Sequence, residues 1–88
     1  MRAAKVDANQ AEIVKALRDV GADVLSIAQL GHNAPDLIVG FRGENYIFEV
    51  KASKKSKLRP GQVIFALNWR GKYSRINSVA DALKAIGL

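Results

Sequence analysis

Two carboxylates and one lysine occupy positions from which they could act on the same substrate. Asp36 opens the segment DLIVGF, and Glu49 and Lys51 end the segment YIFEVK. Carboxylate oxygens are preferred ligands of hard cations such as Mg²⁺ and Mn²⁺, which keep waters that can act as nucleophiles. A lysine beside such an ion can orient the water or offset charge on phosphate oxygens. These residue types would permit metal-assisted hydrolysis of a phosphate ester.

A β-hairpin is the element that must position these three residues. Residues 36–41 and 46–51 read as strands, and they flank the polar, glycine-containing turn 42–45. Because side chains alternate along a strand, Glu49 and Lys51 are expected to share one face.

The pairing register decides whether the two acids can share an ion. If the turn pairs Phe41 with Tyr46, Asp36 lies directly across from Lys51 and diagonal to Glu49, roughly 7–8 Å away at the backbone. A slip of one residue would move Asp36 to the opposite face. The alternative is a solvated strand face with a salt bridge worth well under about 1 kcal/mol, but the apolar neighbours of both acids indicate a position bordering the interior.

The remaining segments predict the order αβββαβα. Apolar periodicity and terminal signals define the other elements: a helix at 7–20 with an Asp7–Gln10 capping box and a Gly21 stop, a strand at 23–28, a helix at 60–70 opened by Pro60 and closed by Gly71, a strand at 73–77, and a last helix capped by Ser78. The apolar stripe of the second of these helices is predicted to be Val63, Ile64 and Leu67.

Length and composition indicate one small globular domain spanning residues 1–88. The chain has no cysteine, so disulfides and cysteine-ligated metals are excluded, and self-association as a homodimer is the expected source of extra stability. Phe65 and Trp69 are expected in the core or at the dimer contact, with base stacking as the alternative. The net charge of +6 suits a polyanionic partner such as DNA. Neither a signal peptide nor a membrane span is expected, which favours the cytoplasm.

The order of these motifs resembles a known nuclease signature. Pro35-Asp36, twelve intervening residues and Glu49-Val50-Lys51 look like the PD-(D/E)XK motif. More narrowly, ANQAEIVKALRDVGA, PDLIVG, FEVK and a later Gln62 are similar to the VRR-NUC family, particularly its stand-alone phage-type members. The resemblance implies a restriction-endonuclease-like αβββαβ core, with a mixed sheet flanked by helices and an extra C-terminal helix here. It also implies a bacterial or phage-infected host cell.

The same resemblance implies roles for individual residues. Asp36, Glu49 and the main-chain carbonyl of Val50 would bind Mg²⁺ or Mn²⁺, and Lys51 would be catalytic. Glu12, on the first helix, would add a direct or water-mediated metal contact; the alternative is a solvent-facing glutamate stabilised by the helix dipole.

Gln62 matches the family's glutamine near the catalytic lysine and is assigned to the catalytic set. Its alternative is a polar residue of the first helical turn that contacts only solvent.

A basic segment follows directly after Lys51 and is expected to hold phosphates of the DNA backbone. A solvated loop is the alternative. The expected nucleic-acid contacts are Lys54, Lys55, Lys57 and Arg59, with Arg75 among the weaker additions. His32, in the loop before Asp36, could also contact a phosphate, and the favoured alternative is a residue that only forms part of a turn.

These observations together predict a Mg²⁺- or Mn²⁺-dependent DNA endonuclease. The family resemblance suggests branched DNA, such as four-way Holliday junctions cut by a homodimer. The rival interpretations are a DNA-binding module without catalysis and a small structural subunit of a larger assembly.

Overall fold

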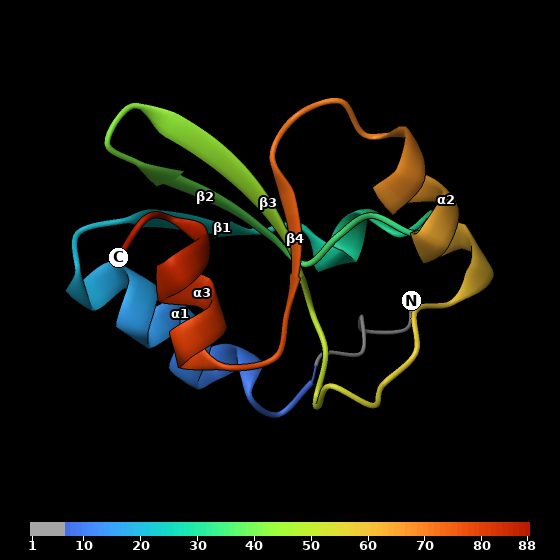
Figure 1. Ribbon diagram of the computed structural model, residues 1–88, viewed down its shortest axis with the longest axis horizontal. Coiled ribbons are helices and arrows are strands. Elements are labelled where there is room, and N and C mark those ends of the chain that lie inside the picture. Colours follow the sequence, from blue (N-terminus) through green and yellow to red (C-terminus); the bar gives the residue numbers. More distant parts are fainter. Residues whose placement is uncertain (1–6) are drawn as a thin grey trace.

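Figure 1 shows the computed structural model, which describes residues 7–88 of the chain. The predicted order αβββαβα is confirmed, with one added 3-10 turn, η1, after the first strand. The elements are α1 (Gln10–Asp19), β1 (Asp23–Ser26), η1 (Ala28–Leu30), β2 (Leu37–Phe41), β3 (Glu44–Val50), α2 (Pro60–Asn68), β4 (Tyr73–Ile76) and α3 (Val79–Ala85).

The four strands form one mixed sheet in the order β1-β2-β3-β4. β1 and β3 both pair antiparallel with β2, whereas β4 pairs parallel with β3. A parallel pair needs a crossover connection, and here the basic loop and α2 supply it. The mixed sheet expected from the sequence is therefore present.

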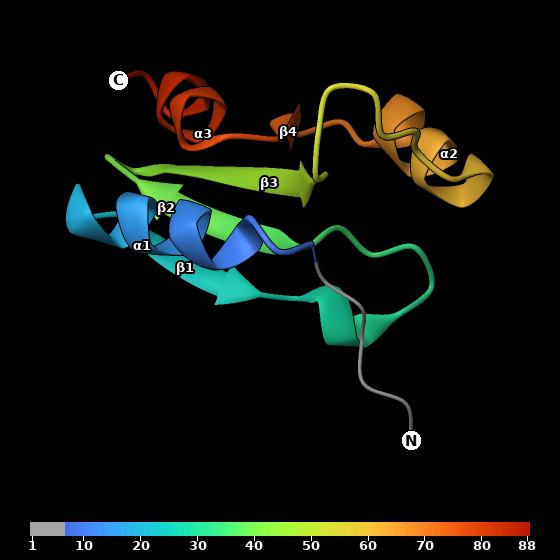
Figure 2. The same cartoon turned by 90° about the horizontal axis from the view of Figure 1, so that it is seen from below.

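The hydrophobic core lies between the sheet and two helices. α1 and α3 contact each other and lie together on the left of Figure 1, whereas α2 stands apart at the other end of the molecule in both views (Figures 1 and 2). Alternate strand residues point into this core, where burial of apolar surface stabilises the fold. The largest fully buried side chains are Phe48, Ile13, Leu17, Leu37, Ile76, Val39 and Val50.

The ends of α1 match the prediction at one terminus only. The predicted capping box was wrong: the N-cap is Asn9, and Gln10 is already the first helical residue. At the other end Gly21 has a φ of +93°, and its N–H and that of Ala22 donate to the carbonyls of the last turn, as in a Schellman motif.

The hairpin turn is shorter than predicted, and this changes the register. Arg42 and Gly43 alone form the turn, both with positive φ (51° and 81°), so Phe41 pairs with Glu44 rather than with Tyr46. Continued one residue beyond the ladder, this register brings Asp36 level with Glu49, not with Lys51. The register expected from the sequence was thus wrong by two residues. An even shift keeps every side chain on its expected face.

α2 contributes little to the core. Its single buried residue is Gln62. The predicted apolar stripe is largely open to solvent, since Val63, Ile64 and Leu67 are 39%, 60% and 79% exposed. The start of the helix packs closely on the loop before Asp36, because a Cβ at Gly61 would come within 2.2 Å of the Asn33 side chain. The helix is thus fixed at its N-terminus and has an apolar surface open to solvent.

Within residues 7–88, no helix is long and apolar enough to cross a membrane.

The two-residue turn predicts a specific sensitivity to substitution. Gly43→Ala should lower the free energy of unfolding by about 1 kcal/mol, because an L-residue is strained at positive φ. Gly40→Ala is the matched control on the same hairpin: its Cβ would meet Asn45 at an ordinary 3.5 Å. Denaturant unfolding of both variants measures the difference, and equal stabilities would contradict the turn assignment.

Candidate active site

A polar pocket of about 350 Å³ lies at the end of β3 and brings most of the predicted site residues together. It is bordered by the loop before β2, by the start of α2 and by Asp7, which lies just before α1. The lining residues are Asp7, Ala28, Gly31, Ala34, Asp36, Glu49, Val50, Lys51, Arg59 and Gln62.

Asp36 and Glu49 are both buried side by side in this pocket, with 9% and 3% of their surfaces exposed. The main chain fixes Asp36: its N–H donates to the Phe48 carbonyl at 3.0 Å. Its Oδ2 accepts a hydrogen bond from the N–H of Val50 at 2.8 Å. The carboxylate of Asp36 is therefore held against the end of β3, the strand that carries Glu49.

Glu49 is hard to ionise in this setting. Burial raises its pKa from 4.5 to about 8, and the adjacent acid Asp36 adds to the rise. The positive charges of Lys51 and Arg59 oppose the shift without cancelling it. A carboxyl group held protonated near neutral pH by burial and by a neighbouring acid is one that a cation would readily ionise.

Lys51 is held by a side chain that sequence reasoning assigned to the catalytic set. Its Nζ donates to Oε1 of Gln62 at 2.9 Å, and the same oxygen accepts the N–H of Arg59 at 2.8 Å. Gln62 is only 5% exposed. The start of α2 therefore fixes the ammonium of Lys51 beside Glu49, with both on the face that strand alternation predicts.

Asn9 is a positioning residue that the sequence did not reveal. Its Nδ2 donates to the carbonyl of Lys51 at 3.0 Å and to that of Asn77 at 2.9 Å. The start of α1 is thereby attached to the ends of β3 and β4. A contact between residues 42 and 68 positions apart has no local pattern that could have indicated it.

The donor set fits a divalent cation that retains waters. Two adjacent buried carboxylates, Asp36 and Glu49, offer hard oxygen ligands whose mutual repulsion a cation would relieve. Within the described part of the chain, no three Asp, Glu, His or Cys side chains come together as a metal-binding group. Mg²⁺ is typically held by one or two carboxylates plus waters, so two are sufficient.

The other predicted metal ligands lie differently. Val50 lines the pocket, as expected for a main-chain ligand. Glu12 is exposed on the first turn of α1 and is not among the lining residues. Asp7, which sequence reasoning treated only as a helix cap, lines the pocket instead.

The predicted nucleic-acid contacts fall into two groups. Arg59 lines the pocket itself. Lys54, Lys55 and Lys57 lie outside it, exposed on the loop that follows β3. His32 is also exposed, in a turn of the loop before β2, with a φ of 54°.

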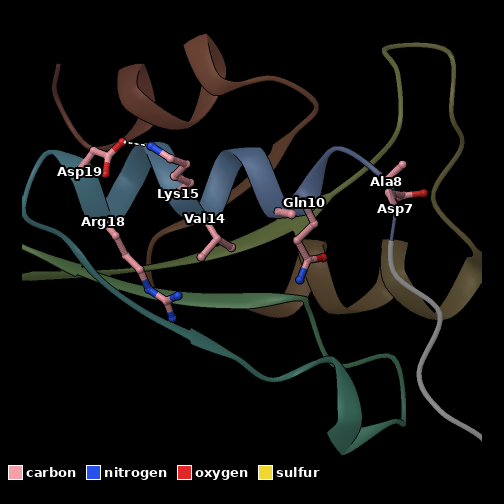
Figure 3. Close-up of a pocket in the computed structure, with 8 residues that line it drawn as sticks. Asp7, Ala8, Gln10, Val14, Lys15, Arg18 and Asp19 are labelled. Carbon is pink, nitrogen blue, oxygen red and sulfur yellow. Dashed lines mark hydrogen bonds and ion pairs between the residues drawn. The ribbon is translucent and has the colours of Figure 1, made fainter.

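A larger hollow of about 660 Å³ runs along α1 and is a weaker candidate (Figure 3). Its charged side chains are largely engaged already: Lys15 pairs with Asp19 at 2.8 Å, and Arg18 donates to the Val24 carbonyl. Among the described residues that line it, no pair of buried acids faces a lysine. The pocket at the end of β3 is therefore the candidate active site.

Comparisons with known proteins agree with this assignment. A solved structure described as a VRR_NUC domain superposes with a TM-score of 0.71, at 26% sequence identity, and the match covers 88% of each chain. No curated protein matches the sequence significantly. The family model for the archaeal Holliday junction resolvase (Hjc) matches residues 1–73, most of the chain. The nuclease resemblance predicted from the PD and EVK motifs is thereby confirmed, and the chain belongs to the archaeal Holliday junction resolvase (Hjc) family of PD-(D/E)XK proteins.

Proposed function

We propose that this protein is a Mg²⁺- or Mn²⁺-dependent endonuclease that hydrolyses phosphodiester bonds in DNA. The observation that carries the proposal is the buried pair Asp36 and Glu49 with the ammonium of Lys51 fixed beside it by Gln62. Membership of a nuclease family supports the same reaction. A structural subunit or a passive DNA-binding module would have no need to bury two acids next to each other.

Asp36, Glu49 and the carbonyl of Val50 would hold the metal. A bound divalent cation would supply Lewis acidity toward a phosphate oxygen and would lower the pKa of water, so that a hydroxide nucleophile is available near neutral pH. Glu12 is proposed to contact the metal through a water, in keeping with its exposed position on the first turn of α1.

Lys51 supplies the positive charge that the protein itself contributes to the reaction. Held by Gln62 at 2.9 Å, its ammonium has two further N–H groups to donate to a phosphate oxygen or to the attacking water. Because the Gln62 oxygen is neutral, it orients the ammonium without cancelling its charge. Gln62 therefore acts on the reaction through Lys51.

Branched DNA is the proposed substrate, with four-way junctions as the preferred form. The basic segment of Lys54, Lys55, Lys57 and Arg59 extends from the pocket and suits the phosphate backbone, and His32 is proposed as a further contact. The matching family is described as Holliday junction resolvases. Action on such DNA would take place in the cytoplasm of a bacterial or phage-infected cell.

The exposed side of α2 is the proposed homodimer surface. Val63, Ile64, Leu67 and the following Trp69 are all at least 39% exposed, and Phe65 stacks on Trp69 with ring centroids 5.2 Å apart. A helix that buries only Gln62 in its own subunit gains stability from a second copy. Two copies would provide the two active sites that symmetrical cutting of a junction requires.

Cleavage of labelled DNA tests the proposed reaction. Four-way-junction, forked and linear duplex DNA should be cut by the wild type in Mg²⁺ or Mn²⁺ but not in EDTA, with the junction cut fastest. Glu49→Gln and Lys51→Ala should each reduce the rate by roughly 10²-fold or more, because each removes a group that stabilises the transition state.

Glu44→Gln is the matched control for the cleavage assay. It removes an acid from the far end of the same strand, where the Glu44 side chain makes an exposed ion pair with Lys72. This variant should cut as the wild type does. Binding without cutting by the wild type would instead support the DNA-binding module, and neither binding nor cutting would support the structural subunit.

The raised pKa of Glu49 predicts pH-dependent metal binding. Below a pKa of about 8 the metal must displace a proton from Glu49, so the affinity for Mn²⁺ should rise between pH 6 and pH 8 and then level off. Calorimetry in buffers of different ionisation enthalpy should detect close to one proton released per ion near pH 7. In the metal-free protein, stability from protonated Glu49 is fully present below pH 4.5 and is lost as the pH rises through about 8.

The same calorimetry on Glu49→Gln provides the control, since this side chain cannot titrate. A pH-independent affinity in the wild type would contradict the assignment of Glu49 as a ligand.

Sedimentation tests the proposed dimer. Leu67→Asp and Ile64→Asp should convert a dimer to monomers, because each places a charge in the proposed apolar contact. Leu88→Asp, at the half-exposed chain end on the other side of the molecule, is the control and should leave the dimer intact. A wild type that sediments as a monomer at micromolar concentration would rule the dimer out.

A further inference from the structure

The basic loop after β3 contains a defined turn. The N–H of Ser56 donates to the Ser53 carbonyl at 3.2 Å, and the N–H of Ser53 donates to the Ser56 hydroxyl at the same distance. The Ser53 hydroxyl accepts the N–H of Lys55 at 3.2 Å. Lys54 and Lys55 are therefore the two central residues of the turn, and both side chains are exposed.

Arg75 holds this turn from the neighbouring strand β4. Its Nη2 lies 2.9 Å from the Ser53 carbonyl oxygen and 3.4 Å from that of Lys54, and it also donates to the Ser56 carbonyl. Arg75 pairs with Glu49 in the parallel register of β3 and β4. The residue that holds the turn is thus rigidly related to the strand that carries the active-site acid.

These contacts leave Arg75 with a different task from the lysines. An NH₂ group has two hydrogens, so three carbonyl oxygens fully engage that edge of the guanidinium. Arg75 is also partly buried, whereas Lys54 and Lys55 are exposed. The sequence suggested a weak DNA contact for Arg75, but the structure turns its Nη2 toward the protein.

We propose that Arg75 is a positioning residue, which orders the Ser53–Ser56 turn so that Lys54 and Lys55 meet the DNA backbone beside the active site. The inference rests on the proposed nuclease function. A turn that is already ordered loses less conformational entropy when it binds, so its lysines contribute more to affinity. Arg75 acts through the lysines and makes no DNA contact of its own.

A mutant cycle on DNA binding tests this inference. The dissociation constant for junction DNA is measured in EDTA for the wild type, Arg75→Ala, the double variant Lys54→Ala/Lys55→Ala, and the triple variant. Arg75→Ala should weaken binding roughly three- to tenfold in the wild-type background and change it little in the double variant. If Arg75→Ala raised the dissociation constant by the same factor in both backgrounds, Arg75 would act independently of the two lysines. That result would indicate a direct DNA contact and would overturn the proposal.

The charge control is Lys15→Ala, which removes one positive charge from an exposed position on α1, where Lys15 pairs with Asp19. It should weaken binding less than Arg75→Ala does. Where the wild type cuts DNA, Arg75→Ala should raise KM and leave kcat nearly unchanged. A fall in kcat alone would also overturn the proposal.

Limited trypsin digestion of the folded protein supplies a readout that needs no DNA. Arg75→Ala should be cut at Lys54 and Lys55 at least several-fold faster than the wild type or Lys15→Ala, with thermal melting nearly unchanged. Unchanged cutting at these lysines would overturn the positioning role. A wild type that neither binds nor cuts DNA would instead overturn the nuclease function itself, whatever the digestion shows.

Discussion

The burial of Asp36 beside Glu49 is the constraint around which the rest of this small protein is arranged. Two adjacent carboxyl groups with under a tenth of their surface exposed cost free energy unless they are hydrogen-bonded, protonated or bound to a cation. The protein meets the cost in part with the N–H of Val50, which donates to Asp36, and with the nearby charges of Lys51 and Arg59. The part of this burial cost that these contacts do not offset raises the pKa of Glu49. The folded chain thus retains a site that a divalent cation would stabilise further.

Around this pair the molecule divides into two parts with different roles. α1, α3 and the sheet enclose the core, and Asn9 ties the start of α1 to the strand ends that form the pocket. α2 and the loops at the other end contribute one buried residue from the helix, Gln62, but border the pocket. The half that contains the core therefore fixes the acids, whereas the more exposed half supplies the basic side chains that we propose contact phosphate. Division of this kind is common where a rigid scaffold positions functional loops.

Local patterns predicted the element order and the shared face of Glu49 and Lys51, because strand alternation and helix periodicity are set by nearby residues. The register was wrong by two residues because Arg42 is an unusual choice for a positive φ, so the two-residue turn was not recognised. The site survived that error because an even shift preserves the faces. The apolar stripe of α2 was read correctly as a stripe, but periodicity cannot tell a core from an exposed surface. The contacts of Asn9 and Arg75 depend on tertiary structure and have no local signal.

One oxygen atom serves two parts of this protein at once. Oε1 of Gln62 accepts the N–H of Arg59 at the start of α2 and the ammonium of Lys51 in the pocket. Helix initiation and the placement of the lysine therefore share a single acceptor, so a substitution at this position would disturb both. Glutamate would keep both contacts but would pair its charge with the lysine, and asparagine would be one methylene too short to reach both. Drift at this site would then have to be accompanied by changes at Lys51 or Arg59, and the three positions should vary together.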